Sequence, residues 1–393
     1  MVENERQASV RWLTAASWAS FVVFTATAAL VATSLKRIGS EFGLSLARRG
    51  ALELARTSVL AASTLGIGCI ADRIGMRRLL GGAMFVVAFA LLRIARSETY
   101  VGLLAGTLAL GAGLGGVTAL VSPLVAGLHP ARVETHMFVL HAFSPLGVVV
   151  SSLLAGWALD AGVPWRTPFA VVSIPSALVG AMFLLGRYPA AHAGGRRTVL
   201  SVPNLFRNPT FWFLAVAMAL TAGTGGCLQF WTPSFIQDSY RASFLAGASG
   251  LAAFSTAMMI GRFGAGLAAR VVPVHRLMIA LCFVCASATL VLVAADSPSV
   301  TFASLGLGGL CVACFWPGIL SVATRRIAAG SATLLASLSV AGIVGLGAMP
   351  WGVGVLGDRF GLRVGLGLLP VAMVATGLTL MAAFRTPRQA ACR

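Results

Sequence analysis

The sequence is built from long apolar runs that are separated by short polar connections. Each run is near the roughly 20 residues that an α-helix needs to cross a bilayer. The pattern therefore predicts an all-α membrane protein with twelve transmembrane helices. The predicted spans are residues 12–34, 51–71, 79–94, 100–128, 137–159, 167–186, 210–236, 244–268, 277–295, 300–323, 331–356 and 364–384.

One connection is longer and more polar than the others. Residues 187–209 contain four arginines, two adjacent glycines and three prolines. Such a composition is typical of a connector between structural units. We therefore expect an N-terminal six-helix bundle over 1–186, a cytoplasmic linker over 187–209 and a C-terminal six-helix bundle over 210–393.

The two halves of the chain share residues at a constant spacing. Matching positions lie 198 residues apart, close to half of the length of 393. This repeat predicts one six-helix unit used twice, in two pseudo-symmetric bundles, as in secondary transporters that bind their solute near the membrane midplane. The matches are Gly68 and Gly266, Ala71 and Ala269, Arg78 and Arg276, Leu79 and Leu277, Gly156 and Gly354, and Asp160 and Asp358.

Composition supports a membrane protein and excludes a soluble one. Hydrophobic residues make up 58% and charged residues 10%, against roughly 45 to 50% and about 25% in soluble proteins. The net charge of +18 does not indicate nucleic-acid binding, because the arginines lie between apolar runs and suit lipid headgroups. A cytoplasmic N-terminus puts 18 of 29 basic residues inside, which favours a bacterial inner membrane with both termini cytoplasmic.

The most specific motif lies in the short loop after the second predicted span. An aspartate at such a tight turn can bind a helix N-terminus in one conformation and release it in another. A solvated loop that only follows the positive-inside rule is the simpler interpretation. The motif residues are Gly68, Asp72, Arg73, Gly75, Arg77 and Arg78.

With this loop the chain resembles the major facilitator superfamily. The resemblance implies that Asp72 closes the cytoplasmic side by meeting the eleventh helix near Ser331, and that Arg73 pairs with an acid near Glu134. Met76 departs from the usual basic residue. In the second half Arg270 stands at the aspartate position, so that half lacks the same anionic latch.

Three further stretches resemble the fucose and glucose permease-like branch of that superfamily. They are HAFSPLG at 141–147, RNPTFWFL at 207–214 and GTGGCLQFWTPSFIQ at 223–237. The resemblance implies that a sugar or polyol is carried by alternating access. A carrier or exchanger of a small organic anion is the alternative.

The positions of the acidic residues depart from that branch. Its proton-coupled members place carboxylates in the first and fourth helices, whereas this chain has Trp18, Thr25 and Thr27 in the first and Thr118 and Ser122 in the fourth. None of the eleven acids falls at the middle of a predicted span. We therefore expect facilitated diffusion or exchange rather than proton symport, although His141 could carry a proton.

Polar and aromatic residues inside the runs are the candidate ligands. His141 is the only histidine within a run, and Gln229 has an amide that donates and accepts. Each could instead be structural, and Trp231 could be an interfacial anchor. The candidate set is His141, Gln229, Trp316, Trp231, Thr118, Ser122 and Arg56.

Basic residues near the outer ends of the first three runs favour the anionic alternative. Seven cations, including Arg56, accompany only Glu41, Glu53 and Glu98, and such an excess could attract an anion. Contact of these side chains with headgroups is the simpler explanation. Arg56 is the most informative because it lies inside the second run.

Other patterns do not change this interpretation. Gly111, Gly113 and Gly116 spell GxGxxG within an apolar run, which favours close helix packing over nucleotide binding. We expect the CxxC pairs of the ninth and tenth runs, at 282–285 and 311–314, to lie at different depths. We expect no metal or cofactor and no enzymatic activity, and a monomer whose partners are a small solute and the lipid bilayer. A receptor that binds without translocating is the main other class.

Overall fold

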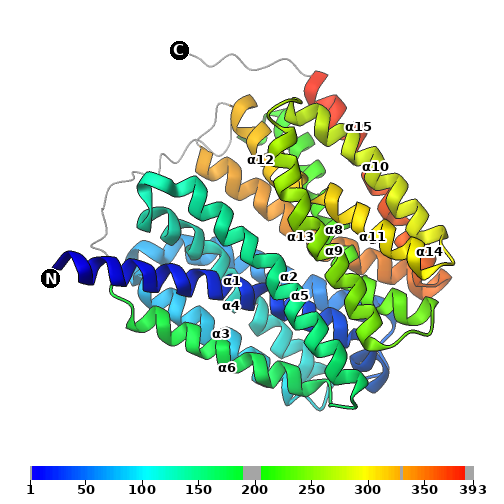
Figure 1. Ribbon diagram of the computed structural model, residues 1–393, viewed down its shortest axis with the longest axis horizontal. Helices are drawn as coiled ribbons and strands as arrows, with labels where there is room; N and C mark the ends of the chain where they lie inside the picture. The colour runs from blue at the N-terminus through cyan, green and yellow to red at the C-terminus, as the bar shows by residue number, and fades with distance from the viewer. Residues whose placement is uncertain (1, 189–204, 328–330, 386–393) are drawn as a thin grey trace. The chain divides into compact units, whose positions relative to one another are not determined.

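The computed structural model describes residues 2–188, 205–327 and 331–385, and every regular element in these ranges is a helix (Figure 1). The elements are α1 (Val2–Glu41), α2 (Leu46–Ile74), α3 (Met76–Ala95), α4 (Tyr100–Leu128), the short 3₁₀ helix η1 (Pro130–Arg132), α5 (Val133–Asp160), α6 (Arg166–Leu185), α8 (Pro209–Ser239), α9 (Phe244–Ala268), α10 (Val274–Ala294), α11 (Pro298–Val312), α12 (Phe315–Arg326), α13 (Ser331–Phe360), α14 (Leu362–Leu366) and α15 (Leu368–Arg385).

These elements confirm the all-α membrane fold. Twelve helical segments within the described ranges are long and apolar enough to cross a bilayer, with α11 and α12 forming one span and α14 and α15 another. Successive spans reverse direction, and we call the side on which α1 ends the outer side. Helices α1 and α2 extend further toward this side than the apolar runs predict, to Glu41 and from Leu46.

The chain divides into two compact units. Unit 1 contains Met1–Leu44, Ala55–Ala193 and Ala242–Ala252, and unit 2 contains Ser45–Leu54, Gly194–Arg241 and Ala253–Arg393. The first turns of α2 therefore belong to the unit that holds most of the second half of the chain. Likewise, the first turns of α9 belong to the unit that holds most of the first half.

Glycines allow close helix contacts within unit 1. A Cβ atom at Gly113 would lie 2.8 Å from the carbonyl oxygen of Ala83 in α3, and one at Gly116 would lie 2.7 Å from the Cβ of Ala83. A Cβ at Gly111 would overlap the carbonyl group of Arg56 in α2. The GxGxxG pattern is therefore a packing motif, as expected.

In unit 2 the main close contact joins α8 and α13. A Cβ at Gly345 would overlap the backbone of Ala219, and one at Gly223 would lie 3.0 Å from the carbonyl oxygen of Gly345. The two glycines thus face each other across the helix pair. This contact fixes the helix that carries several of the candidate solute ligands.

Several spans contain a proline, and one span contains a helix break. Pro123, Pro145 and Pro350 lie inside α4, α5 and α13. The tenth span breaks between α11 and α12, just before Pro317. Because proline lacks the N–H of a helical hydrogen bond, such positions allow a helix to bend.

Candidate functional site

Helix α8 carries two of the expected ligands, Gln229 and Trp231, and they differ in how accessible their side chains are to a solute. Gln229 is half-buried. Trp231 is fully buried, and its indole N–H donates to the carbonyl oxygen of Pro350 at 3.0 Å. Because this bond uses the only polar atom of the indole, Trp231 stabilises the contact between α8 and α13.

Two polar side chains near the outer end of α8 are buried without hydrogen-bond partners. Ser234 is 1% exposed and Gln237 is 2% exposed. The hydroxyl of Ser234 and both amide atoms of Gln237 find no partner among the described residues. Leaving such a group unsatisfied costs roughly 1–3 kcal/mol. These residues, three apart on one helix face, are therefore candidate ligands for a polar molecule.

Ser234 and Gln237 are not among the ligands predicted from the sequence. Both residues fall within the stretch 223–237, but a serine and a glutamine near the end of an apolar run carry no periodic signal. Only the packing around them shows that they are cut off from other polar groups.

Helix α1 shows a similar contrast. Thr33 and Ser34 are buried, and their hydroxyls have no partner in the described part of the chain. Thr25, by contrast, donates to the carbonyl oxygen of Ser144 in α5 at 2.6 Å, and Thr27 donates within its own helix at 2.7 Å. Thr25 and Thr27 are therefore satisfied, whereas the two residues further toward the outer end are not.

The other candidates in unit 1 lie on α4 and α5. His141 is exposed and meets the ring of Phe21 edge-on, with ring centroids 5.3 Å apart. Thr118 donates to the carbonyl oxygen of Leu114 in its own helix at 2.9 Å, and Ser122 is half-buried. His141 is therefore the most accessible of the three.

Trp316 follows the break between α11 and α12 in unit 2. Its ring is half-buried and lies so close to α13 that a Cβ at Gly342 would be 2.6 Å from it. The glycine therefore admits the ring, and the ring orientation is fixed by packing. Trp316 belongs to the same unit as Gln229, whereas His141, Thr118 and Ser122 belong to unit 1.

Helix α2 buries two charged residues within its membrane-spanning segment. Glu53 is 8% exposed and Arg56 is 6% exposed, and both interact with other groups of the protein. Glu53 comes seven residues after Leu46, roughly 10 Å along the helix. It also acts electrostatically on Cys227 of α8. Carboxylates at such depth are candidate proton carriers.

Glu53 was predicted to be an acid near the outer end of the second run, and its burial was not predicted. Helix α2 begins five residues before the apolar run, so Glu53 lies further from the end of the span than the run predicts. A signal was present, because Arg49, Glu53 and Arg56 are spaced by four and three residues and share one helix face. Facilitated diffusion or exchange therefore stays a prediction, and a buried carboxylate in a span makes proton coupling through Glu53 a second one.

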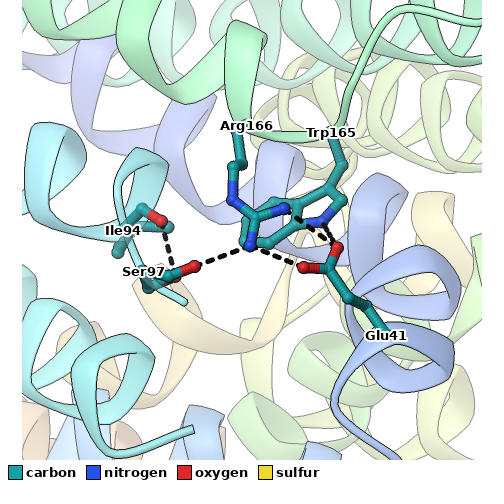
Figure 2. A network of polar contacts seen from close by, with 5 residues as sticks. All are labelled: Glu41, Ile94, Ser97, Trp165 and Arg166. Carbon is teal, nitrogen blue, oxygen red and sulfur yellow. Dashed lines mark hydrogen bonds and ion pairs between the residues drawn. The ribbon is translucent and has the colours of Figure 1, made fainter. Parts of the chain in front are cut away.

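A polar network fixes the outer end of unit 1 (Figure 2). Arg166, at the start of α6, forms two hydrogen bonds with Glu41 at the end of α1, at 2.9 and 2.6 Å. Arg166 also donates to the carbonyl oxygen of Ser97 at 2.6 Å, and the indole N–H of Trp165 donates to Glu41 at 2.6 Å. The network joins α1, α6 and the connection after α3, so it stabilises the unit.

Two histidines stack where α4 meets α5. The ring centroids of His129 and His136 are 3.5 Å apart, and Nε2 of His129 lies 2.8 Å from the hydroxyl of Thr14 in α1. Burial, followed by the nearby imidazole of His136, lowers the pKa of His129 below its ordinary value. This histidine is therefore mostly neutral at neutral pH.

The four cysteines of the CxxC pairs lie together in the buried core of unit 2, so the expectation of different depths is wrong. The packing of α10 against α11, with Cys314 just after the end of α11, brings the two pairs together. Within the described ranges, no three His, Cys, Asp or Glu side chains are arranged to hold a metal ion.

Comparison with known proteins decides the family. A model of the Major Facilitator Superfamily matches residues 16–346, which is most of the chain. The chain belongs to the major facilitator superfamily. No curated protein matches this facilitator significantly.

Solved structures share the fold of this facilitator. A bacterial homologue of the human lysosomal transporter Spinster, in an inward-facing and occupied conformation, is 18% identical with a TM-score of 0.75, covering 96% of this chain and 95% of that chain. The D323A mutant of the nucleoside transporter NupG is 11% identical with a TM-score of 0.81, covering 96% and 100%. At these identities the likeness shows the fold alone.

The facilitator loop motif forms a one-residue turn between α2 and α3. Gly75 has a φ of +91°, a conformation that favours glycine. The guanidinium of Arg77 donates to the carbonyl oxygen of Leu184 at 2.5 Å and ties this turn to α6. Arg73 and Arg78 are exposed, and a Cβ at Gly68 would meet nothing within 4 Å.

The contacts expected of Asp72 and Arg73 remain predictions. The side chains of Asp72, Glu134 and Ser331 lie outside the described residues. The described part of the loop shows the turn that would present Asp72, but not what the carboxylate meets.

The loop motif recurs at the outer end of α13. Asp358 to Arg363 reads DRFGLR, against DRIGMR at Asp72 to Arg77. Gly361 has a φ of +88° and separates α13 from α14 as Gly75 separates α2 from α3. The spacing of this recurrence is 286 residues, so a comparison of the two halves at 198 residues does not find it.

Proposed function

We propose that this facilitator moves a small neutral polar solute, a sugar or polyol, by alternating access between bundles formed by residues 1–186 and 210–393. The observation that carries this proposal is the set of buried, unpartnered, neutral groups on α1 and α8, namely Thr33, Ser34, Ser234 and Gln237. Hydroxyls of a solute both donate and accept, so they match hydroxyl and amide groups without any charge to balance.

Other features support the same solute class. Gln229, Thr118 and Ser122 add neutral polar groups, His141 adds an imidazole, and Trp316 adds an aromatic face suited to the C–H surface of a sugar. The resemblance to the fucose and glucose permease-like branch implies a sugar. NupG, which shares the fold, is a nucleoside transporter, and nucleosides contain a sugar unit.

Transport of a small organic anion is the second candidate. Arg56 favours it, because a guanidinium buried in a span can bind a carboxylate through two hydrogen bonds. Under this alternative Arg56→Gln weakens uptake of the anion and leaves binding of neutral solutes unchanged.

Uptake into proteoliposomes tests the solute class. We expect saturable uptake of at least one of D-glucose, L-fucose and uridine, and no uptake of lactate or succinate. Ser234→Ala and Gln237→Leu should raise the KM by roughly tenfold each, the change expected for one lost hydrogen bond. The matched control is Ser40→Ala, since that exposed hydroxyl bonds only its own helix. Uptake of the acids alone would reject the sugar proposal in favour of the anion carrier.

We place the protein as a monomer in a bacterial inner membrane with both termini cytoplasmic. The excess of basic residues in the inner connections supports this orientation. A reporter enzyme that is active only in the periplasm, fused after Arg393, should be inactive; activity would reverse the orientation.

A further inference from the structure

A carboxylate at the outer end of α5 caps the start of a helix from the other half of the sequence. Asp160 accepts hydrogen bonds from the backbone N–H groups of Phe244 and Leu245 at 2.8 and 2.9 Å. The hydroxyl of Ser243 also bonds this carboxylate. All of these residues lie in unit 1 and include the first residues of α9.

The outer end of α13 repeats this arrangement in unit 2. Asp358 accepts hydrogen bonds from the backbone N–H groups of Leu46 and Ala47, at 2.6 and 3.1 Å, at the start of α2. Ser45 again supplies a hydroxyl. Each of these residues lies 198 positions from its counterpart in unit 1, so the two caps are related by the internal repeat.

Small residues bring each helix pair together beneath its cap. A Cβ at Gly156 would lie 3.0 Å from the carbonyl oxygen of Phe244, and one at Gly354 would overlap the carbonyl group of Leu46. A Cβ at Gly50 would lie 2.7 Å from the carbonyl oxygen of Pro350. Side chains therefore do not separate the backbones, and each carboxylate reaches the free N–H groups directly.

The hydrogen bonds of each cap stabilise the contact between its two helices, but they can also break when the helices separate. A helix N-terminus offers unpaired N–H groups and a partial positive charge, so a carboxylate there forms charge-assisted hydrogen bonds. Nearby cations strengthen the electrostatics, because Arg37 acts on Asp160 and Arg49 acts on Asp358. Both carboxylates are exposed, so water can replace the N–H groups when the helices separate.

We propose that Asp160 and Asp358 are paired gating residues that close the outer side of the carrier and release together when it opens there. This inference rests on the proposed transport function. The alternation of the spans puts both caps on the outer side, and each joins helices from opposite halves of the sequence. Opening this side therefore requires that Asp160 leave α9 and that Asp358 leave α2.

The recurrence of the loop motif relates the proposed outer gate to the loop between α2 and α3 on the inner side. Asp358 stands at the same motif position as Asp72, and the turns after both end in a glycine with positive φ. The contact of Asp358 with the start of α2 shows what an aspartate in this motif can do. The same loop design thus serves the outer side through Asp358 and, under the facilitator resemblance, the inner side through Asp72.

The test measures opening without using any solute. Spin labels on Glu98→Cys and Ser297→Cys, in a Cys69→Ser and Cys392→Ser background, report the distance between two exposed outer connections in the reconstituted full-length protein. Removing the caps with Asp160→Ala and Asp358→Ala should raise the population with longer distances by roughly tenfold per cap, as for one lost charge-assisted hydrogen bond. Asp160→Asn and Asp358→Asn keep an acceptor and should give a smaller shift.

Controls separate a gate from an ordinary helix cap. Glu41→Gln, which removes an ion pair within unit 1, should lower thermal stability without changing the distances. If all four cap variants lower stability while the distances stay those of the parent, the gating role is rejected. If the alanine variants do not fold, the asparagine variants decide the outcome by the same criterion. A distance shift in a protein that carries none of the probe solutes would support the gate and count against the proposed substrate class only.

Discussion

At the scale of single residues, Glu53 is the first candidate for coupling transport to a proton gradient. It is a carboxylate buried in a span, and it acts electrostatically on Cys227 of α8. If Glu53 carries a proton, Glu53→Gln abolishes uptake driven by a pH gradient but preserves exchange of labelled for unlabelled solute, because exchange needs no net proton movement. Proteoliposome assays with whichever probe solute is taken up separate the two modes.

The control for Glu53 is Glu98→Gln, which neutralises an exposed outer carboxylate. It should leave both modes of transport unchanged. Gradient-driven uptake that survives Glu53→Gln would assign coupling elsewhere, with His141 as the next residue to change.

His129 makes stability depend on pH. Its pKa is lowered in the folded protein by burial and by His136, whereas the unfolded chain has the ordinary value of about 6.5. The unfolded state therefore binds more protons as the pH falls below about 6.5, and the folded state loses stability there. The Tm of the purified protein should fall between pH 7.5 and 5.5, and His129→Gln should reduce this fall. An equal fall in the variant would remove His129 from the explanation.

At the scale of elements, two glycines of α13 allow the effect of close helix packing on stability to be distinguished from the effect of helix propensity. Gly345→Ala introduces a Cβ that overlaps the backbone of Ala219, so we expect a loss of about 1–3 kcal/mol and a lower Tm. Gly352→Ala is the matched control in the same helix, because its Cβ would meet only a side-chain atom of Leu368 at 3.7 Å. Alanine there should be neutral or stabilising. Equal Tm values for the two variants would contradict the close contact of α8 with α13.

Hydropathy predicts the spans well but their ends poorly. Every predicted run coincides with a helical span and extends at most two residues past it, because burial in lipid requires apolar side chains along the whole segment. The start of α2 was predicted too late since Asp358, which caps it, is more than 300 positions away in sequence. The prediction that the two cysteine pairs lie at different depths was wrong for a similar reason. The packing of one helix against another decides which residues meet, and the sequence of a single span does not contain that information.

At the scale of the whole molecule, the internal repeat was the most informative sequence feature. It singled out Gly156, Asp160, Gly354 and Asp358. The structure shows why they recur: in each half the glycine allows a neighbouring helix to pack closely and the aspartate caps the N-terminus of that helix. The sequence predicts candidate ligands but does not show which of them are free to bind a solute. Whether a polar side chain already has a hydrogen-bond partner depends on its neighbours in other helices. Ser234 and Gln237 show this most clearly.

The unpartnered atoms of Ser234 and Gln237 also bear on selectivity. A solute that reaches these atoms does not have to break a hydrogen bond within the protein. Each solute hydroxyl that bonds them therefore contributes the whole free energy of that hydrogen bond to binding. Discrimination would then follow the number and placement of hydroxyls more than molecular size, and deoxy analogues would be rejected more strongly than bulkier sugars that keep the same pattern.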